Sequence, residues 1–220
     1  QQDVKEVVLD AKAIIIKDVQ VEGKKGKYYL RDNDKSEVFG SPLVIDLEEV
    51  QRNIGDVLIV QISYSTTTES TALQFLDKMQ TEGKEFPYLF TQCQQIHARS
   101  LLPIQDTPHA KFTYTAQVTV PKPLTCLMSA LRSSPPMDDG KKTTFYFEQQ
   151  IPIPSYLMAI AVGKITSRTL SDRCDVWGEE EVVEKALYDF GEAEEFLKAA
   201  EDICGPYEWT RYDILCLPSS

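Results

Sequence analysis

Hydrophobic and polar residues alternate most regularly in the middle of the chain, between Phe112 and Val120. Every second side chain there is apolar or aromatic, and the residues between them are threonine or glutamine. A period of two residues is that of a β-strand with one face on a core and the other in solvent. The pattern therefore predicts a half-buried strand over residues 112–120, ended by Pro121 and Pro123.

Shorter runs rich in β-branched and aromatic residues predict further strands. In residues 57–64, Val57 and Ile59 fall on one face, and the other face carries Leu58, Val60, Ile62 and Tyr64. Residues 156–162 are nearly all apolar, as expected of a strand covered on both sides. Together with residues 112–120, the predicted strands are residues 6–9, 13–21, 27–30, 43–47, 57–64, 124–131, 143–149, 156–162 and 213–217.

Polar and turn-forming residues separate these runs. They predict a turn at residues 24–26, a surface loop at 31–37, a break at 65–68 and a loop at 133–142. Asn53, Gly55 and Asp56 separate two of the strands. Residues 72–79 fit either a short helix or an irregular loop, and the pattern leaves both open.

The C-terminal part changes to a helical period, which predicts helices over residues 179–190 and 192–204. In the second helix, apolar residues recur at helical spacing: Ala193, Phe196, Leu197, Ala200 and Ile203. The Gly205-Pro206 pair then supplies a stop. We therefore expect a mainly β chain whose C-terminal end carries two helices and one more strand.

The net charge bears on which partners the chain could bind, and the cysteines bear on the compartment in which it works. The formal net charge of −11 argues against nucleic acid, because phosphate binding needs a basic face. Much of it comes from residues 175–202, which hold eleven acidic residues against Lys185 and Lys198, and a solvated helical face is the expected explanation. Five widely spaced cysteines without a CxxC pair fit a reducing, cytoplasmic setting. We also expect no signal peptide and no membrane partner, because the longest apolar run is too short for a bilayer.

Residues 87–108 form the one stretch that suggests polar recognition. It opens as a strand, continues into Gln92, Gln94, Gln95 and His97, returns to apolar residues and closes in a turn at residues 106–108. Apolar flanks would hold the backbone while the amides face a ligand. A strand-to-turn transition, whose glutamines only satisfy backbone groups, explains the same pattern. From the local pattern both interpretations remain open.

Two other groups of residues invite a chemical interpretation. Cys93 and His97 could be imagined as a thiol–imidazole pair, but an extended segment would carry them apart, so we expect no nucleophile. His97 is instead expected to pack beside Arg99 as a satisfied polar residue. The aromatic residues Tyr207, Trp209 and Tyr212 could form a binding surface, although packing between elements is the expectation that we favour. We predict no catalytic residue in this chain.

Long blocks of the sequence resemble a known family. They read PYLFTQCQQIHARSLLPIQDTP, FTYTAQVTVPKPLTCLMSA, IPIPSYLMAIAVG, EEVVEKALYDF and AEDICGPYEWTRYDILCLP. These blocks resemble the N-terminal domain of the zinc aminopeptidases, in the aminopeptidase N family and closest to its leukotriene A(4) hydrolase branch. The resemblance covers almost the whole chain.

The resemblance implies a domain organisation. Residues 1–164 would be a saddle-like or sandwich-like β-sheet domain without its first strands. Residues 165–220 would begin the α-helical, thermolysin-like zinc catalytic domain and end before its metal site. The chain does not start with Met, and nothing in it resembles a natural start, so we expect an internal piece.

The resemblance also implies a reaction for the parent protein, the removal of N-terminal residues from peptides, and it leaves epoxide hydrolysis open. The family holds its zinc with an HExxH helix and a downstream Glu. This chain has only His97 and His109 and no HExxH. We therefore expect zinc in the parent protein, none in this chain, and no peptide hydrolysis by the chain alone.

One functional position carries over from the family to Gln94, which would hold the free α-amino group of a peptide substrate through its carboxamide oxygen. Gln92 lies nearby, and Gln95 departs from the small residue usual in the hydrolase branch, which changes the expected pocket. The predicted substrate-binding residues are thus Gln92, Gln94 and Gln95. Their expected partners are peptide N-termini and the catalytic domain of the same polypeptide. The alternative is a non-enzymatic β-sandwich that binds other proteins, although such a module has no need of the helical C-terminal extension.

Overall fold

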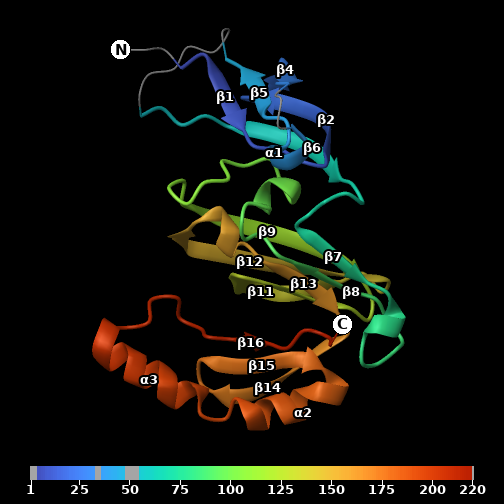
Figure 1. Cartoon of the computed structure of the whole chain (residues 1–220), viewed down its shortest axis with the longest axis vertical. Helices are drawn as coiled ribbons and strands as arrows, with labels where there is room; N and C mark the ends of the chain where they lie inside the picture. Colours follow the sequence, from blue (N-terminus) through green and yellow to red (C-terminus); the bar gives the residue numbers. More distant parts are fainter. Residues whose placement is uncertain (1–3, 33–35, 48–54, 220) are drawn as a thin grey trace. The chain divides into compact units, whose positions relative to one another are not determined.

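The computed structural model describes residues 4–32, 36–47 and 55–219 (Figure 1). The chain divides into two compact units. The first unit contains the described residues up to Leu73, with Thr91–Phe112 and Ile153–Met158. The second unit contains Gln74–Phe90, Thr113–Pro152 and Ala159–Ser220, of which residues up to 219 are described.

In its described residues, the first unit is built from two antiparallel sheets of three strands, ordered β1-β5-β4 and β3-β2-β6. Its core contains Val19, Leu43 and Ile45, all fully buried. The strands are β1 (Glu6–Leu9), β2 (Ile14–Val21), β3 (Lys24–Lys25), β4 (Tyr28–Leu30), β5 (Leu43–Asp46) and β6 (Val60–Thr66). Short helical turns accompany them: α1 (Ser36–Phe39), η2 (Ala98–Ser100) and η3 (Ser155–Leu157).

The predicted strands of the first unit are found, with shifted borders. Leu58, Val60 and Ile62 pack on the core while Val57 and Ile59 are exposed, as the alternation predicted. The predicted break at 65–68 is wrong in its first half, because Ser65 and Thr66 still pair with β2. The strand predicted at 57–64 therefore starts and ends later than expected.

The turn predicted at residues 24–26 lies at Glu22 and Gly23 instead. Both residues have positive φ, of 51° and 74°, and such a two-residue turn matches the twist of a hairpin. Lys24 and Lys25 are thereby free to pair with β2. The predicted loop at 31–37 falls partly outside the described residues, and its end forms the start of α1. The predicted separator Asn53 also lies outside the described residues.

The second unit contains three sheets, ordered β10-β13-β8-β7, β11-β12-β9 and β14-β15-β16. Phe145, Phe147 and Cys126 are central to one core cluster, and Tyr88 and Ala161 to another. The strands are β7 (Leu73–Leu76), β8 (Tyr88–Thr91), β9 (Phe112–Pro121), β10 (Thr125–Met128), β11 (Leu131–Asp138), β12 (Lys142–Ile153), β13 (Ile160–Gly163), β14 (Ile165–Ser171), β15 (Cys174–Glu179) and β16 (Ile214–Leu215). The helices are η1 (Lys78–Gln80), α2 (Glu180–Asp189) and α3 (Ala193–Cys204).

Several predictions for the second unit need correction. The loop predicted at 133–142 is mostly β11, an edge strand that accommodates Pro135 and Pro136 through two register shifts. Residues 72–79, expected to be helix or loop, form β7 and the start of η1. The run at 156–162 begins in η3 and becomes a strand only at Ile160. The hairpin of β14 and β15 was not predicted.

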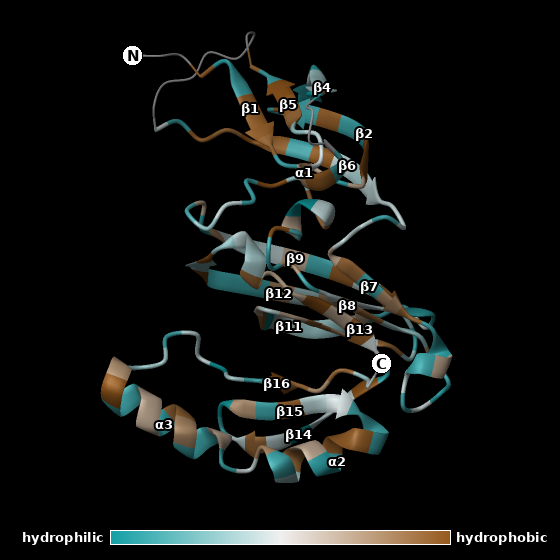
Figure 2. Ribbon diagram, viewed as in Figure 1, coloured by the Kyte–Doolittle hydropathy of each residue, from teal (hydrophilic) through white to brown (hydrophobic). Residues whose placement is uncertain are grey.

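The alternation of β9 is confirmed, since partly or fully buried residues alternate with exposed ones along its whole length. The two helices are also confirmed, and Gly205, with a φ of 94°, follows the last turn of α3. Hydrophobic and hydrophilic residues alternate along α3 (Figure 2), and Phe196 and Ile203 are exposed. The chain is thus mainly β, with two C-terminal helices and a final strand. Within the described residues, no helix combines the length and apolar character needed to cross a membrane.

The acidic run on these helices is only partly a solvated face. Arg168 of β14 binds Glu180 and Glu184 at 2.7 and 2.5 Å. Arg173 binds Glu194 and Glu201 at 3.1 and 2.6 Å. Two arginines thus partner four of the carboxylates and connect the β14–β15 hairpin to both helices.

Candidate functional site

The glutamine turn, defined as Gln92–His97, follows directly after β8. The N–H of Gln92 donates to the carbonyl of Ala72 at 2.9 Å, and the N–H of His97 donates to the carbonyl of Cys93 at 2.9 Å. The Gln94–Gln95 and Gln95–Ile96 peptide bonds are cis. The three predicted binding residues, Gln92, Gln94 and Gln95, all have exposed side chains within this one turn. They are therefore accessible to a ligand.

The His97 imidazole pairs with Thr71 rather than with the Cys93 thiol. The segment is a turn, so extension does not separate the two residues, and His97 Nδ1 hydrogen-bonds Thr71 Oγ1 at 2.8 Å. The Cys93 thiol is buried, and burial raises its pKa to about 11, assisted by the negative charge of Asp106. The thiol is therefore protonated at neutral pH and unsuited to nucleophilic attack.

Thr71 connects the end of the turn to the residues that follow it. Its hydroxyl lies 3.1 Å from the hydroxyl of Ser100, and the Ser70 hydroxyl donates to the Ser100 carbonyl at 2.8 Å. His97 is thus a satisfied polar residue, as expected. Its hydrogen-bond partner is Thr71, whereas the expectation had placed His97 beside Arg99.

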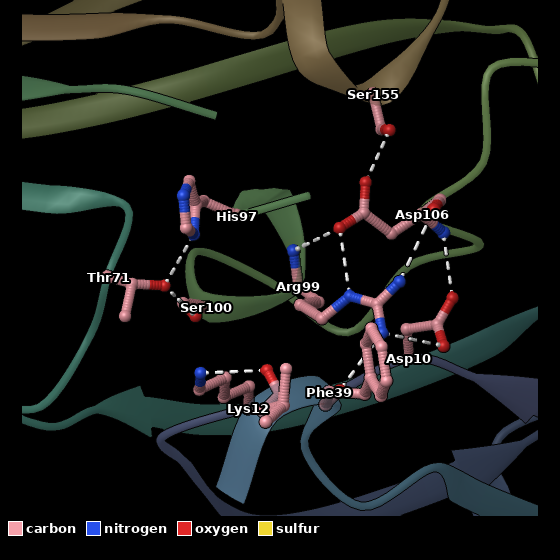
Figure 3. Close-up of polar contacts among 10 residues, drawn as sticks. Asp10, Lys12, Phe39, Thr71, His97, Arg99, Ser100, Asp106 and Ser155 are labelled. Atoms are coloured by element: carbon pink, nitrogen blue, oxygen red, sulfur yellow. Dashed lines mark hydrogen bonds and ion pairs between the residues drawn. The ribbon is translucent and has the colours of Figure 1, made fainter. Parts of the chain in front are cut away.

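A buried ionic cluster lies immediately after the glutamine turn (Figure 3). This Arg99 cluster consists of Arg99, Asp106, Asp10, Ser155 and the carbonyl of Phe39. The Arg99 guanidinium donates through Nε to Asp106 Oδ2 at 3.0 Å and through Nη1 to the Phe39 carbonyl at 2.9 Å. Nη1 also lies 3.4 Å from Asp10 Oδ1. The side chains of Arg99 and Asp106 are only 8% and 2% exposed, so this pair is buried.

The Asp106 carboxylate is satisfied on both oxygens. Oδ2 accepts from the Nε and from the backbone N–H of Arg99, and Oδ1 accepts from the Ser155 hydroxyl at 2.6 Å. The backbone N–H of Asp106 donates to Asp10 Oδ2 at 3.0 Å. A buried charge is tolerated only when it is paired and hydrogen-bonded in this way.

The Arg99 cluster was not predicted from the sequence. Asp106 was interpreted as a turn residue, and Ser155 and Asp10 were not singled out. A signal was available in Arg99, which stands in the largely apolar run from Ala98 to Leu102. A charged side chain inside an apolar run needs a buried partner. That signal predicts a partner but does not identify it.

The residues described here do not fit a zinc ion. Within the described part of the chain, no three histidines, cysteines, aspartates or glutamates are arranged to hold a metal. The Nδ1 atom of His97 hydrogen-bonds Thr71, and His109 is exposed.

The aromatic residues after α3 contact one another. The Tyr207 ring lies 5.6 Å from that of Trp209 and 5.9 Å from that of Tyr212. The backbone N–H groups of Tyr207 and Tyr212 donate to Glu201 Oε1 and to the Arg173 carbonyl. These backbone contacts attach the segment to α3 and to the β14–β15 turn, while Trp209 and Tyr212 are each 42% exposed. The expected packing between elements therefore describes the backbone of this segment and only part of its aromatic surface.

Comparison with known proteins shows which proteins this chain resembles. The family model described as the Peptidase M1 N-terminal domain matches residues 1–157. Leukotriene A-4 hydrolase of Xenopus laevis is 45% identical over 222 residues, which cover 100% of this chain and 36% of that protein. Leucine aminopeptidase 2 of Yarrowia lipolytica is 43% identical over 217 residues, covering 98% of this chain and 32% of that protein. The chain thus spans about a third of the length of these curated relatives.

Solved structures agree on the fold. Native yeast LTA4 hydrolase matches with a TM-score of 0.86 and 35% identity, over 98% of this chain and 32% of that one. The M1 zinc metallopeptidase from Deinococcus radiodurans matches with a TM-score of 0.78 and 20% identity, over 100% of this chain and 50% of that one. At 20% identity the second match concerns the fold alone.

Proposed function

The chain belongs to the Peptidase M1 N-terminal domain family, and we propose on that basis that it is the N-terminal part of a zinc aminopeptidase. The whole enzyme would remove N-terminal residues from peptides. The observation that carries the proposal is the 45% identity to a leukotriene A-4 hydrolase along the whole chain. In the proposed organisation, residues 1–164 form the β-rich N-terminal domain and residues 165–220 begin the catalytic domain. Zinc would be bound by other residues of the enzyme.

In this proposal the chain contributes the binding of the substrate's free amino group. The Gln94 side chain is exposed, so its carboxamide oxygen can accept a hydrogen bond from an ammonium group. Gln92 and Gln95, exposed in the same turn, would line the pocket beside it. An amide accepts without a full charge, which leaves room for a ligand that carries no ammonium group. Acceptance of a lipid epoxide is therefore part of the proposal for the whole enzyme, and it depends on the pocket shape that Gln95 gives.

A cytoplasmic location completes the proposal. The five cysteines are all free thiols, as expected of a reducing compartment. The alternative of a self-standing interaction module has no observation of its own in favour of it. Its weakness is the similarity to hydrolases and aminopeptidases, which continues through α2 and α3 to the end of the chain.

The test uses the complete protein that contains this chain. Replacing Gln94 by Ala removes the acceptor, and a hydrogen bond to a charged group contributes about 1.5–3 kcal/mol, so kcat/KM on an aminoacyl anilide should fall roughly ten- to hundredfold. Gln94→Glu keeps an acceptor and should retain activity on peptides. Gln117→Ala, which alters an exposed glutamine on β9, is the matched control. Unchanged kinetics for Gln94→Ala would refute the assigned role.

A further inference from the structure

The glutamine turn is fixed at both ends and exposed in the middle. At its start, Gln92 is hydrogen-bonded to Ala72. At its end, His97 is hydrogen-bonded to Thr71, and the residues of η2 that follow are buried. The exposed Gln94 side chain thus projects from a short segment whose two ends cannot move independently of the first unit.

The Arg99 cluster attaches the residues that follow the turn to the rest of the first unit. Arg99 joins η2 to the Phe39 carbonyl, to Asp10 and to Asp106. Asp106 in turn hydrogen-bonds Ser155 and Asp10. The backbone reinforces them, because the N–H of Lys12 donates to the Arg99 carbonyl at 3.0 Å, and Asp10 exchanges two hydrogen bonds with Ile104. The planar guanidinium with its fixed donors accepts one orientation of these partners.

Stability alone is a weak explanation for such a cluster. Burying two charges costs desolvation energy, and well-packed apolar residues often serve the fold equally well. What apolar residues cannot supply is a single directed orientation. A group that binds a substrate atom through one hydrogen bond needs its position defined within a fraction of an ångström.

We infer that Arg99 and Asp106 are positioning residues for Gln94. The cluster fixes η2, and η2 fixes the end of the turn that carries the amide, while neither Arg99 nor Asp106 touches the substrate. This inference rests on the proposed function of Gln94. Ser155 belongs to the same device, because its hydroxyl holds the second oxygen of Asp106.

The first test is a set of conservative variants in the complete protein, with peptide kinetics as the readout. Arg99→Lys keeps the positive charge but loses the planar set of guanidinium donors. Ser155→Ala removes one hydrogen bond without removing a charge. Each should raise KM by about threefold to tenfold with kcat within about twofold, the signature of weakened substrate binding. Tyr114→Phe, which removes the hydrogen bond to Ser129 in the second unit, should leave KM unchanged. If Arg99→Lys fails to fold, Ser155→Ala decides this test.

The second test is a double-mutant cycle. If the cluster acts through Gln94, then Ser155→Ala or Arg99→Lys should change KM by less than about 1.5-fold once Gln94 is already Ala, because coupled residues are not additive. The same KM increase in both backgrounds would overturn the positioning role, as would unchanged KM for both single variants. Failure of the proposed function can be told apart from failure of the positioning role. If the proposed function is wrong, Gln94→Ala itself leaves the kinetics unchanged.

Discussion

Gly163 of β13 lies against the ring of Tyr88 in the neighbouring strand β8. A Cβ atom at position 163 would stand 2.4 Å from Tyr88 Cδ2 and 2.6 Å from Cε2. Tyr88 is 1% exposed, so its ring is enclosed on all sides. The absence of a side chain at position 163 is thus a packing requirement of the second unit, because the tyrosine has no space into which it could move.

Gly163→Ala should therefore destabilise the second unit by about 1–3 kcal/mol, the usual cost of overpacking a core. The matched control is Gly83→Ala, where the new Cβ would meet only the end of the flexible Glu181 side chain, at 3.2 Å. Urea unfolding of the chain measures both free energies. Equal effects of the two substitutions would contradict the predicted contact.

Removing one partner of the Arg99–Asp106 ion pair should destabilise the fold more than replacing both partners by apolar residues. Asp106→Ala removes the buried carboxylate that pairs with Arg99 and leaves Arg99 only the longer, partly exposed pairing with Asp10, so it should lower the free energy of unfolding by about 3–5 kcal/mol. The double variant Arg99→Met with Asp106→Leu removes both charges and should be less destabilised than the single one. Urea unfolding followed by circular dichroism compares them. A double variant as unstable as Asp106→Ala would mean that the loss is not caused by an unpaired charge.

The exposure of the five cysteines predicts which thiols react. Cys204 is exposed, whereas Cys93 and Cys126 are buried, and burial raises their pKa to about 11 and about 12. Because the thiolate is the reactive form, a thiol reagent at neutral pH should modify Cys204 first and leave Cys93 and Cys126 unmodified. Mass mapping of the labelled peptides measures the order. Fast labelling of Cys93 in the native chain would show that the glutamine turn opens readily.

Parts of the fold follow from sequence because they depend on local alternation. The faces of residues 57–62 and of β9 were predicted correctly, since burial of every second residue leaves a direct trace in the sequence. The strand β11 could not be predicted, because Pro135 and Pro136 are compatible with a strand only at a sheet edge. Edge position follows from the order of strands in space. The β14–β15 hairpin was missed because arginine and serine interrupt its β-branched residues.

The candidate site was predictable only where a local pattern of residues marked it. Polar residues between apolar flanks indicated the glutamine turn, and the family resemblance singled out Gln94 within it. The surrounding support had no local signal: Asp10 and Asp106 are 96 residues apart, and His97 is 26 residues from Thr71. Such contacts follow from the tertiary fold, which no spacing rule encodes.

The contacts that Glu201 of α3 makes with Arg173 and Tyr207 should weaken at low pH. The hydrogen bonds from Arg173 and from the Tyr207 N–H lower the pKa of Glu201 from 4.5 to about 2. A carboxylate whose pKa is lower in the folded state stabilises that state fully above its unfolded pKa, near 4.5, and loses the contribution as the pH falls through about 2. NMR titration of the Glu201 carboxyl in the chain should show this pKa. Arg173→Gln should return it toward 4.5, and an unchanged value would contradict the assigned cause.

Two tyrosine hydroxyls give predictions of opposite sign. In the described part of the chain, the Tyr88 hydroxyl is buried without a hydrogen-bond partner, and burial, with the nearby charge of Glu179, raises its pKa. The Tyr114 hydroxyl donates instead to the Ser129 carbonyl at 3.0 Å. A buried hydroxyl without a partner costs about 1–3 kcal/mol, whereas a satisfied one contributes about 1 kcal/mol.

Tyr88→Phe should therefore raise the free energy of unfolding, and Tyr114→Phe should lower it, although each change removes the same single oxygen atom. Urea unfolding of the chain measures both under identical conditions. A loss of stability for Tyr88→Phe would mean that its hydroxyl is hydrogen-bonded in solution. If the two signs differ as predicted, the environment of each hydroxyl decides the effect, since the chemistry of the substitution is the same at both positions.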